Sequence, residues 1–236
     1  MKYSFEHIIP PGVVTKEGNV APSHVLSVFQ QAATDHAEIL GVGFDALLEK
    51  GLLWVVTQVK YQVMGDIREG DALTVTTWPL PHNRLGFERD YRVCSKTGEV
   101  LIKGVSNWAL MDADTRRLAM PFAVYPGTDF CMDRNFEDRP KRLRDFEAEG
   151  PGCTLVPDES YIDRNGHVNN TRYADLAAAA LGGFAGRIDT FQMDYLHEVM
   201  HGEAVTLHFT PIDGGIRLKG EDETGLRKFA CSVIYR

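Results

Sequence analysis

The chain has 236 residues, of which 44% are apolar and 25% charged, a composition that is typical of globular proteins and argues against a disordered or fibrous chain. At about 150 residues per domain, this length is more than one small domain and less than two large ones. Thirty-three acidic against 25 basic residues give a net charge of −8, which argues against nucleic-acid binding.

The cysteines and the apolar segments indicate the cellular compartment in which the protein works. The four cysteines, Cys94, Cys131, Cys153 and Cys231, show no C-x-x-C spacing and are too few for a disulfide framework, so we expect free thiols. The first residues lack the apolar stretch of a signal peptide, and the longest glycine-free apolar run, Leu176 to Leu181, is far too short to cross a bilayer. The sequence therefore predicts a cytoplasmic protein without membrane insertion.

The first half of the chain reads as one helix followed by strands. Residues Val25 to Leu40 place apolar side chains at helical spacing, and Gly41 follows as a stop. Strand patterns and turns then come in the order Gln58-Val-Lys-Tyr61, Gly70-Asp-Ala-Leu-Thr-Val75, Thr97-Gly98 and Val105 to Leu110. This order predicts an α+β unit.

The second half repeats the same plan. A helix is expected over Asn169 to Leu181, with asparagines suited to capping its start and Gly182-Gly183 at its end. The strand and turn patterns are Gln192-Met-Asp-Tyr195, Gly202-Glu-Ala-Val-Thr-Leu207, Thr224-Gly225 and Phe229 to Tyr235. Chance similarity among hairpins is the alternative, but the shared order of helix, strands and turns favours a duplication.

A proline-rich segment lies between the two halves. Residues 126–157 contain four prolines and the basic cluster Arg139-Pro-Lys-Arg-Leu-Arg144. We interpret this segment as the linker between the repeats.

The densest group of polar side chains comes directly before the second helix, in Asp163-Arg-Asn165-Gly-His167-Val-Asn-Asn170. Asn165-Gly166 favours a tight turn, and His167 is expected at or near the helix N-terminus, where unpaired N–H groups favour developing negative charge. A capped turn with a surface histidine explains the pattern equally well. The stretch before the first helix has no carboxylate at the matching place, so only the second half carries this chemistry.

The sequence His197-Glu-Val-Met-His201 matches the zinc motif H-E-x-x-H. That motif requires a helix, which brings both imidazoles to one metal ion, whereas this stretch follows a strand pattern. We therefore treat the match as accidental and expect no metal or cofactor. Glu198 is then a carboxylate at a strand end, which could return to the helix start and meet His167.

Several short motifs in both halves match one known family. The first half carries Leu52-Leu-Trp-Val-Val-Thr57, Thr77-Trp78, Thr97-Gly-Glu99, Ser106-Asn-Trp108 and Asp114-Thr-Arg-Arg-Leu118. The second half carries Asp163-x-Asn165-x-His167-Val-Asn-Asn170, Tyr173 and Tyr195-Leu-His-Glu198. With these motifs the chain resembles, over nearly its whole length, the acyl-(acyl carrier protein) thioesterases of plant and bacterial fatty-acid synthesis.

The resemblance implies a tandem double hot-dog fold of the α+β class, in which each unit is a long helix wrapped by an antiparallel sheet. It implies an N-terminal unit over residues 1–125 that shapes an acyl pocket, the linker 126–157, and a catalytic unit over residues 158–236. The implied reaction is hydrolysis of acyl-(acyl carrier protein) thioesters, which releases free fatty acids and ends chain elongation. A homodimer stays open, since hot-dog sheets often pair at their edges.

Carried over by position, the resemblance implies Asp163, Asn165, His167 and Glu198 as the catalytic set. Plant members often have a cysteine directly after the glutamate, whereas Val199 stands here, so the departure favours direct attack by water. Glu198 with His167 would deprotonate the water, and Asn165 or backbone N–H groups at the helix start would stabilise the oxyanion. Asp163 would hold the loop or tune its neighbours.

The implied partner, acyl carrier protein, is acidic, so a local basic patch should dock it. Candidates are Arg139, Lys141, Arg142, Arg144, Arg116 and Arg117. A solvated linker explains the first four equally well.

Three other functions compete with this one. A hot-dog enzyme acting on coenzyme A thioesters, or an enoyl-thioester hydratase, is the nearest rival. A catalytically silent acyl-chain binder is the second, and the presence of the whole loop together with Glu198 argues against it. A zinc peptidase is the third. The preferred acyl chain length does not follow from the sequence.

Overall fold

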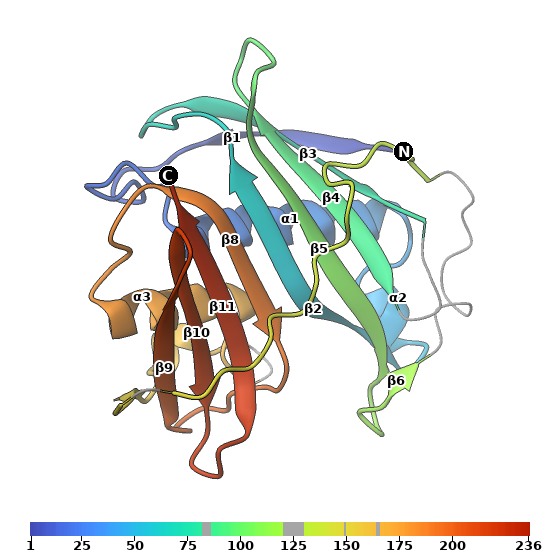
Figure 1. Ribbon diagram of the computed structural model, residues 1–236. Helices are drawn as coiled ribbons and strands as arrows, with labels where there is room; N and C mark the ends of the chain where they lie inside the picture. The colour runs from blue at the N-terminus through green and yellow to red at the C-terminus, as the bar shows by residue number, and fades with distance from the viewer. Residues whose placement is uncertain (82–85, 120–129, 149, 164–165) are drawn as a thin grey trace.

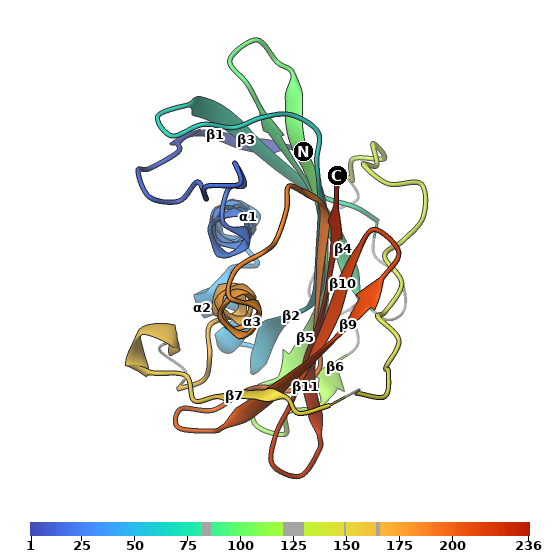
Figure 2. The same ribbon diagram turned by 60° about the vertical axis from the view of Figure 1, so that its left-hand side comes forward.

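Helices lie on one face of a single antiparallel sheet in the computed structural model (Figures 1 and 2). The structure describes residues 1–81, 86–119, 130–148, 150–163 and 166–236. Within these ranges no helix is long and apolar enough to cross a membrane. The four cysteines in them are free thiols, as predicted.

The first half forms the larger share of the sheet. Its elements are β1 (Tyr3–Ile8), α1 (Pro22–Ile39), α2 (Phe44–Leu48), β2 (Leu52–Val63), β3 (Ala72–Pro79), β4 (Phe87–Cys94), β5 (Val100–Asp112) and β6 (Leu118–Ala119). The predicted helix is confirmed, although it begins three residues earlier than Val25. Pro22 stands in its first turn, where the fixed φ of proline favours a helix start.

The second half repeats this order with shorter elements. They are β7 (Cys153–Leu155), the 3₁₀ turns η2 (Glu159–Tyr161) and η3 (Asn170–Arg172), α3 (Tyr173–Leu181), β8 (Ile188–Tyr195), β9 (Val205–Ile212), β10 (Gly215–Glu221) and β11 (Arg227–Tyr235). Asn169 caps η3, since its side chain accepts a hydrogen bond from Thr171 N, as expected of the asparagines there. The α-helix itself starts only at Tyr173.

The strand order shows the two-fold character of the repeat. Along the described part of the chain the order is β1-β3-β4-β5-β2-β8-β11-β10-β9-β7, with β6 paired to β5. The sequence β3-β4-β5-β2 mirrors β9-β10-β11-β8, and β1 and β7 take the matching edges. This arrangement confirms the predicted duplication and the α+β class. The division of the chain at residues 125 and 158 stays a prediction, and the pairing of β7 with β9 favours counting β7 with the second repeat.

The two repeats meet where β2 pairs with β8. Val59 lies opposite Met193 in this antiparallel pair, with Gln58 opposite Asp194 and Lys60 opposite Gln192. Because Gln58 and Gln192 hold matching places in the two repeats, the pseudo-two-fold axis passes between Val59 and Met193.

The helices pack on the inner face of the sheet through aromatic contacts. In the first repeat Phe29 of α1 stacks on Tyr91 with ring centroids 4.2 Å apart. A Cβ at Gly104 would lie 2.3 Å from the Phe29 ring, so this close approach requires glycine. In the second repeat Tyr173 of α3 packs edge-on against Phe229, with centroids 5.0 Å apart.

The segment between the repeats lies across the outer face of the sheet, opposite the helices (Figure 2). We call its described residues 130–148 the connecting segment. Buried side chains of the sheet hold its backbone: Gln58 and Gln192 both donate to the Lys141 carbonyl, and Asp194 accepts from Leu143 N at 2.6 Å. The backbone of the connecting segment is therefore bound to the sheet, while most of its side chains, among them Lys141, Arg142 and Arg144, are exposed.

A buried acid under the connecting segment gives folding a pH dependence. Asp90 is 1% exposed, and burial raises its pKa to about 6, although Asn135 N donates to the carboxylate. In an unfolded chain the pKa is about 3.9, so rising pH between 4 and 6 removes a proton from the unfolded chain first and lowers native stability.

Asp90→Asn removes this ionisation while it keeps a polar side chain for Asn135. We expect the free energy of unfolding at pH 7.5 to rise by about 1–3 kcal/mol. The gain should disappear at pH 3.5, where Asp90 of the wild type is protonated in both the folded and the unfolded chain. Urea unfolding of wild type and variant at the two pH values measures this difference. Equal gains at both values would contradict the assignment.

Candidate active site

A short loop before η3 presents His167. Asp163 N donates to the His167 carbonyl at 2.9 Å, and Gly166 N donates to the Asp163 carbonyl at 3.1 Å, which closes the loop. Val168 N then donates to the Val199 carbonyl at 2.8 Å, so His167 pairs as a single β-bridge with Met200. His167 thus lies on an extended segment three residues before η3, and not in the first turn of the α-helix.

The segment after β8 carries Glu198, and the buried Tyr173 and the partly buried Tyr195 fix it. Val199 N donates to the Tyr173 hydroxyl at 3.0 Å, and the Tyr195 hydroxyl donates to the Asn170 carbonyl at 2.9 Å. Burial raises the pKa of both phenols, so they stay protonated. The backbone beside Glu198 is therefore tied to the start of the helix.

His167 lies between two carboxylates. Its Nδ1 is 3.5 Å from Asp163 Oδ2, and its Nε2 is 3.5 Å from Glu198 Oε1. The His167 side chain is 18% exposed and that of Glu198 42% exposed. A histidine between two carboxylates can be oriented by one of them and can exchange a proton with the other. Distances of this kind often shorten when substrate binds.

Three of the four predicted site residues therefore come together. Asp163, His167 and Glu198 meet although 31 residues separate the last two, and their catalytic roles stay a prediction. Asn165, the fourth, lies outside the described residues. The H-E-x-x-H stretch is not helical, and the described residues contain no group of three histidine, cysteine or acidic side chains able to hold a metal ion.

Backbone N–H groups near the loop are candidate oxyanion donors. Between residues 166 and 172, most of these groups donate to carbonyl or side-chain oxygens. Those of His167 and Asn170 make no hydrogen bond within the described part of the chain. The sequence predicts Asn165 or backbone N–H groups at the helix start as the oxyanion donor. Among the backbone groups, those of His167 and Asn170 stay candidates, and Asn165 lies outside the described residues.

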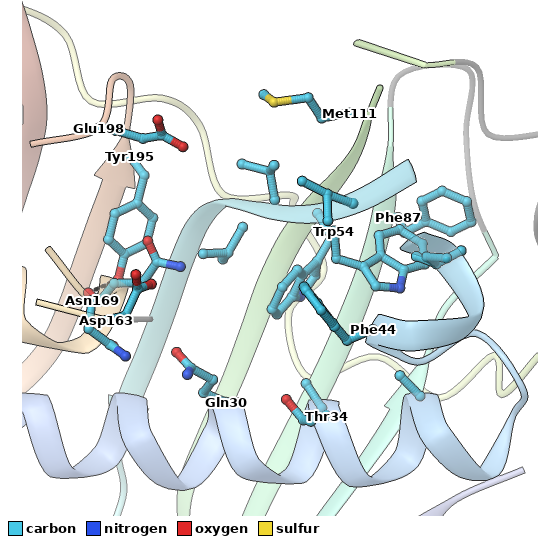
Figure 3. A pocket seen from close by; sticks show the side chains of 18 of the residues that line it. Gln30, Thr34, Phe44, Trp54, Phe87, Met111, Asp163, Asn169, Tyr195 and Glu198 are labelled. Carbon is cyan, nitrogen blue, oxygen red and sulfur yellow. Dashed lines mark hydrogen bonds between the residues drawn. The ribbon is translucent and has the colours of Figure 1, made fainter. Parts of the chain in front are cut away.

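A cavity of about 1020 Å³ opens beside this site. Figure 3 shows Asp163, Asn169 and Glu198 at one end, and Trp54, Phe44 and Phe87 at the other. Helix α1 forms its floor in that view and contributes Gln30 and Thr34. Apolar walls with a few polar groups at one end are typical of a cavity that binds a largely apolar ligand with a polar head.

Sequence reasoning missed one member of the site. Arg116, which follows β5, donates from Nη2 to Glu198 Oε1 and lines the cavity. It was assigned only to carrier docking, because nothing in the sequence relates a turn in the first repeat to a carboxylate in the second.

The fold and the site together define a tandem hot-dog protein in which His167, between two carboxylates, lies at the mouth of an apolar cavity. The family model described as the acyl-ACP thioesterase N-terminal domain matches residues 1–121. This match covers just over half of the chain, which therefore belongs to the acyl-ACP thioesterase family.

Individual relatives agree with this assignment. The chloroplastic palmitoyl-acyl carrier protein thioesterase of Gossypium hirsutum is 36% identical over 163 residues, which cover 63% of this chain and 40% of that protein. An acyl-ACP thioesterase from Bacteroides thetaiotaomicron shares the fold with a TM-score of 0.89 at 23% identity, covering 100% of this chain and 98% of that one.

The 12:0-ACP thioesterase from Umbellularia californica also shares the fold, with a TM-score of 0.84 at 24% identity over 100% of this chain and 97% of that one. These two structures confirm the tandem hot-dog fold. The match to the Gossypium protein, by contrast, spans only about two-fifths of that relative's length.

Proposed function

We propose that the protein hydrolyses acyl-(acyl carrier protein) thioesters and releases free fatty acids. One observation carries the proposal: the Asp163–His167–Glu198 chain lies at the polar end of the apolar cavity. Side chains of the first repeat, among them Trp54 and Phe87, line the far end, in keeping with a specificity role for that repeat.

The proposed chemistry uses water and no cofactor. Glu198, coupled to His167, takes a proton from the water, and the oxygen adds to the thioester carbon. Asn165 or the N–H groups of His167 and Asn170 stabilise the oxyanion. The C–S bond then breaks, and the departing thiolate takes the proton back from the Glu198–His167 pair. Asp163 keeps the imidazole oriented.

Coenzyme A thioesters are the second candidate substrates, because the same site would accept their acyl group. The names of the relatives favour the carrier-linked form, since the Gossypium protein is called a palmitoyl-acyl carrier protein thioesterase. A silent acyl binder is disfavoured by the Glu198–His167 contact, which a binding pocket does not require.

We place the docked carrier at the mouth of the cavity, beside the exposed Arg117. The basic cluster of the connecting segment is a poorer candidate, because it lies on the outer face of the sheet (Figure 2), whereas helix α1 on the inner face lines the cavity. Arg139 is in addition occupied by the buried carboxylate of Glu88 at 2.5 Å.

We further propose a reducing compartment such as the cytoplasm, on the grounds of the four free thiols. A homodimer also stays a prediction. Sedimentation of the purified protein decides the oligomeric state.

The function is tested by release of free thiol from a panel of acyl-carrier and coenzyme A thioesters of different chain lengths. Wild type is compared with His167→Ala and Arg117→Glu. We expect hydrolysis that depends on chain length, is faster on carrier-linked chains, and falls about 100-fold or more in His167→Ala. Arg117→Glu should raise KM for carrier-linked substrates.

No thiol release by wild type on any substrate would overturn the hydrolase and favour the acyl binder. Equal or better use of coenzyme A thioesters would instead transfer the proposal to the second candidate.

A further inference from the structure

Arg116 has a backbone conformation that its side chain disfavours. Its φ is +57°, and among the described residues it is the only one other than glycine with positive φ. The turn that holds it joins β5 to β6: the Asp112 carboxylate accepts from Thr115 N and Oγ1 at 2.7 Å each, and Arg116 N donates to the Asp112 carbonyl at 3.0 Å. Glycine would adopt this conformation without steric cost.

The side chain of Arg116 reaches the other repeat. Its Nη2 donates to Oε1 of Glu198, which lies 82 residues further along the chain. The same Oε1 is 3.5 Å from His167 Nε2. Oε2 of Glu198 makes no hydrogen bond with any described residue, so one oxygen is held and the other is left for a water molecule.

The ion pair between Arg116 and Glu198 is not explained by a contribution to folding stability. Its side chains are 47% and 42% exposed, and ion pairs exposed to this degree contribute little to stability. The left-handed backbone of Arg116 lowers stability further. A strained residue kept at the mouth of a site points to a role in function.

We propose that Arg116 is a positioning residue: it holds Oε1 of Glu198 beside His167, so that Oε2 faces the attacking water. The inference rests on the proposed hydrolysis and adds that the first repeat completes the catalytic site of the second. A glutamate side chain that is half exposed has several rotamers, and only one of them keeps the carboxylate beside the imidazole.

Kinetics on one carrier-linked substrate test the proposal, with Arg116→Gln, Arg116→Lys, Glu198→Gln and the double variant Arg116→Gln/Glu198→Gln. We expect Arg116→Gln to lower kcat about 10- to 100-fold with little change in KM, and Arg116→Lys to retain part of the rate. The double variant should be no slower than Glu198→Gln alone, because Arg116 acts through that carboxylate. Arg68→Gln, which removes an exposed arginine between β2 and β3 that does not line the cavity, is the matched control.

Three outcomes would overturn the inference while leaving the hydrolase intact. They are an unchanged kcat in Arg116→Gln, a rise in KM alone, which would assign Arg116 to carrier docking, and losses that multiply in the double variant. If wild type itself releases no thiol, the proposed function fails instead.

Arg116→Gly separates positioning from folding. Since glycine relieves the left-handed backbone, we expect this variant to melt at a higher temperature than wild type and still lose kcat to the level of Arg116→Gln. A lower melting temperature together with the loss of rate would show that Arg116 is structural, and would overturn the proposal.

Discussion

Glu198→Gln should lower kcat for thioester hydrolysis by about 10²- to 10⁴-fold, since a general base contributes a factor of this size. The amide keeps the size of the side chain but cannot take a proton from water. Because Glu198 is 42% exposed, we expect the melting temperature to change little. Stopped-flow or steady-state thiol release, together with a thermal melt, measures both quantities.

Glu159→Gln provides the matched control for this variant. It changes a carboxylate of the same repeat that lies in η2, is exposed, and does not line the cavity. If Glu198→Gln retained a rate within a few-fold of both wild type and this control, the water would have to be activated by His167 alone.

Asp194→Ala should be the most damaging change to the fold. The carboxylate is 1% exposed and accepts hydrogen bonds from Gln58 Nε2 at 2.7 Å, Gln192 Nε2 at 2.9 Å and Leu143 N at 2.6 Å. Truncation leaves these donors without their acceptor, so we expect a loss of about 3 kcal/mol in the free energy of unfolding. Urea denaturation measures the loss.

The same variant should also release the connecting segment, which limited proteolysis between residues 130 and 148 would detect as faster cleavage. Asp213→Ala, in the exposed turn between β9 and β10, is the control and should leave both measurements near wild type. Cleavage as slow as in wild type would mean that the two glutamines hold the segment without Asp194.

The local pattern of apolar and polar residues predicted most helices and strands well, but it predicted poorly which residues far apart in the sequence are in contact. The apolar spacing from Val25 to Leu40 predicted α1 to within a few residues, and the alternation around Gln58 and Gln192 predicted β2 and β8. These signals depend only on neighbouring residues. The edge strand β7 was missed, because its three residues lie in a proline-rich stretch whose composition resembles a linker. The edge strand β1 was missed although its six residues alternate between partly buried and exposed side chains.

The site could be predicted only in part for the same reason. The residues of the Asp163–His167 loop are adjacent in sequence, so their meeting could be inferred. The contact of Glu198 with His167 depends on how far β8 runs before the chain turns back. Arg116 reaches Glu198 only because the two repeats lie side by side, which no spacing within either repeat encodes.

The hydrogen bonds from Gln58 and Gln192 to one carbonyl, that of Lys141, have a consequence for assembly. These glutamines are related by the pseudo-two-fold axis, so the carbonyl between them lies near that axis. There is room for only one peptide carbonyl on such an axis, so only one of the two repeats can provide the connecting segment that carries it. In a dimer of two identical half-length chains, both copies of the connecting segment would compete for the position between the two glutamines, and only one copy could bind there. The fused chain avoids the competition, so a pair of separated halves should be stable only as a mixed pair in which one member carries residues 130–148.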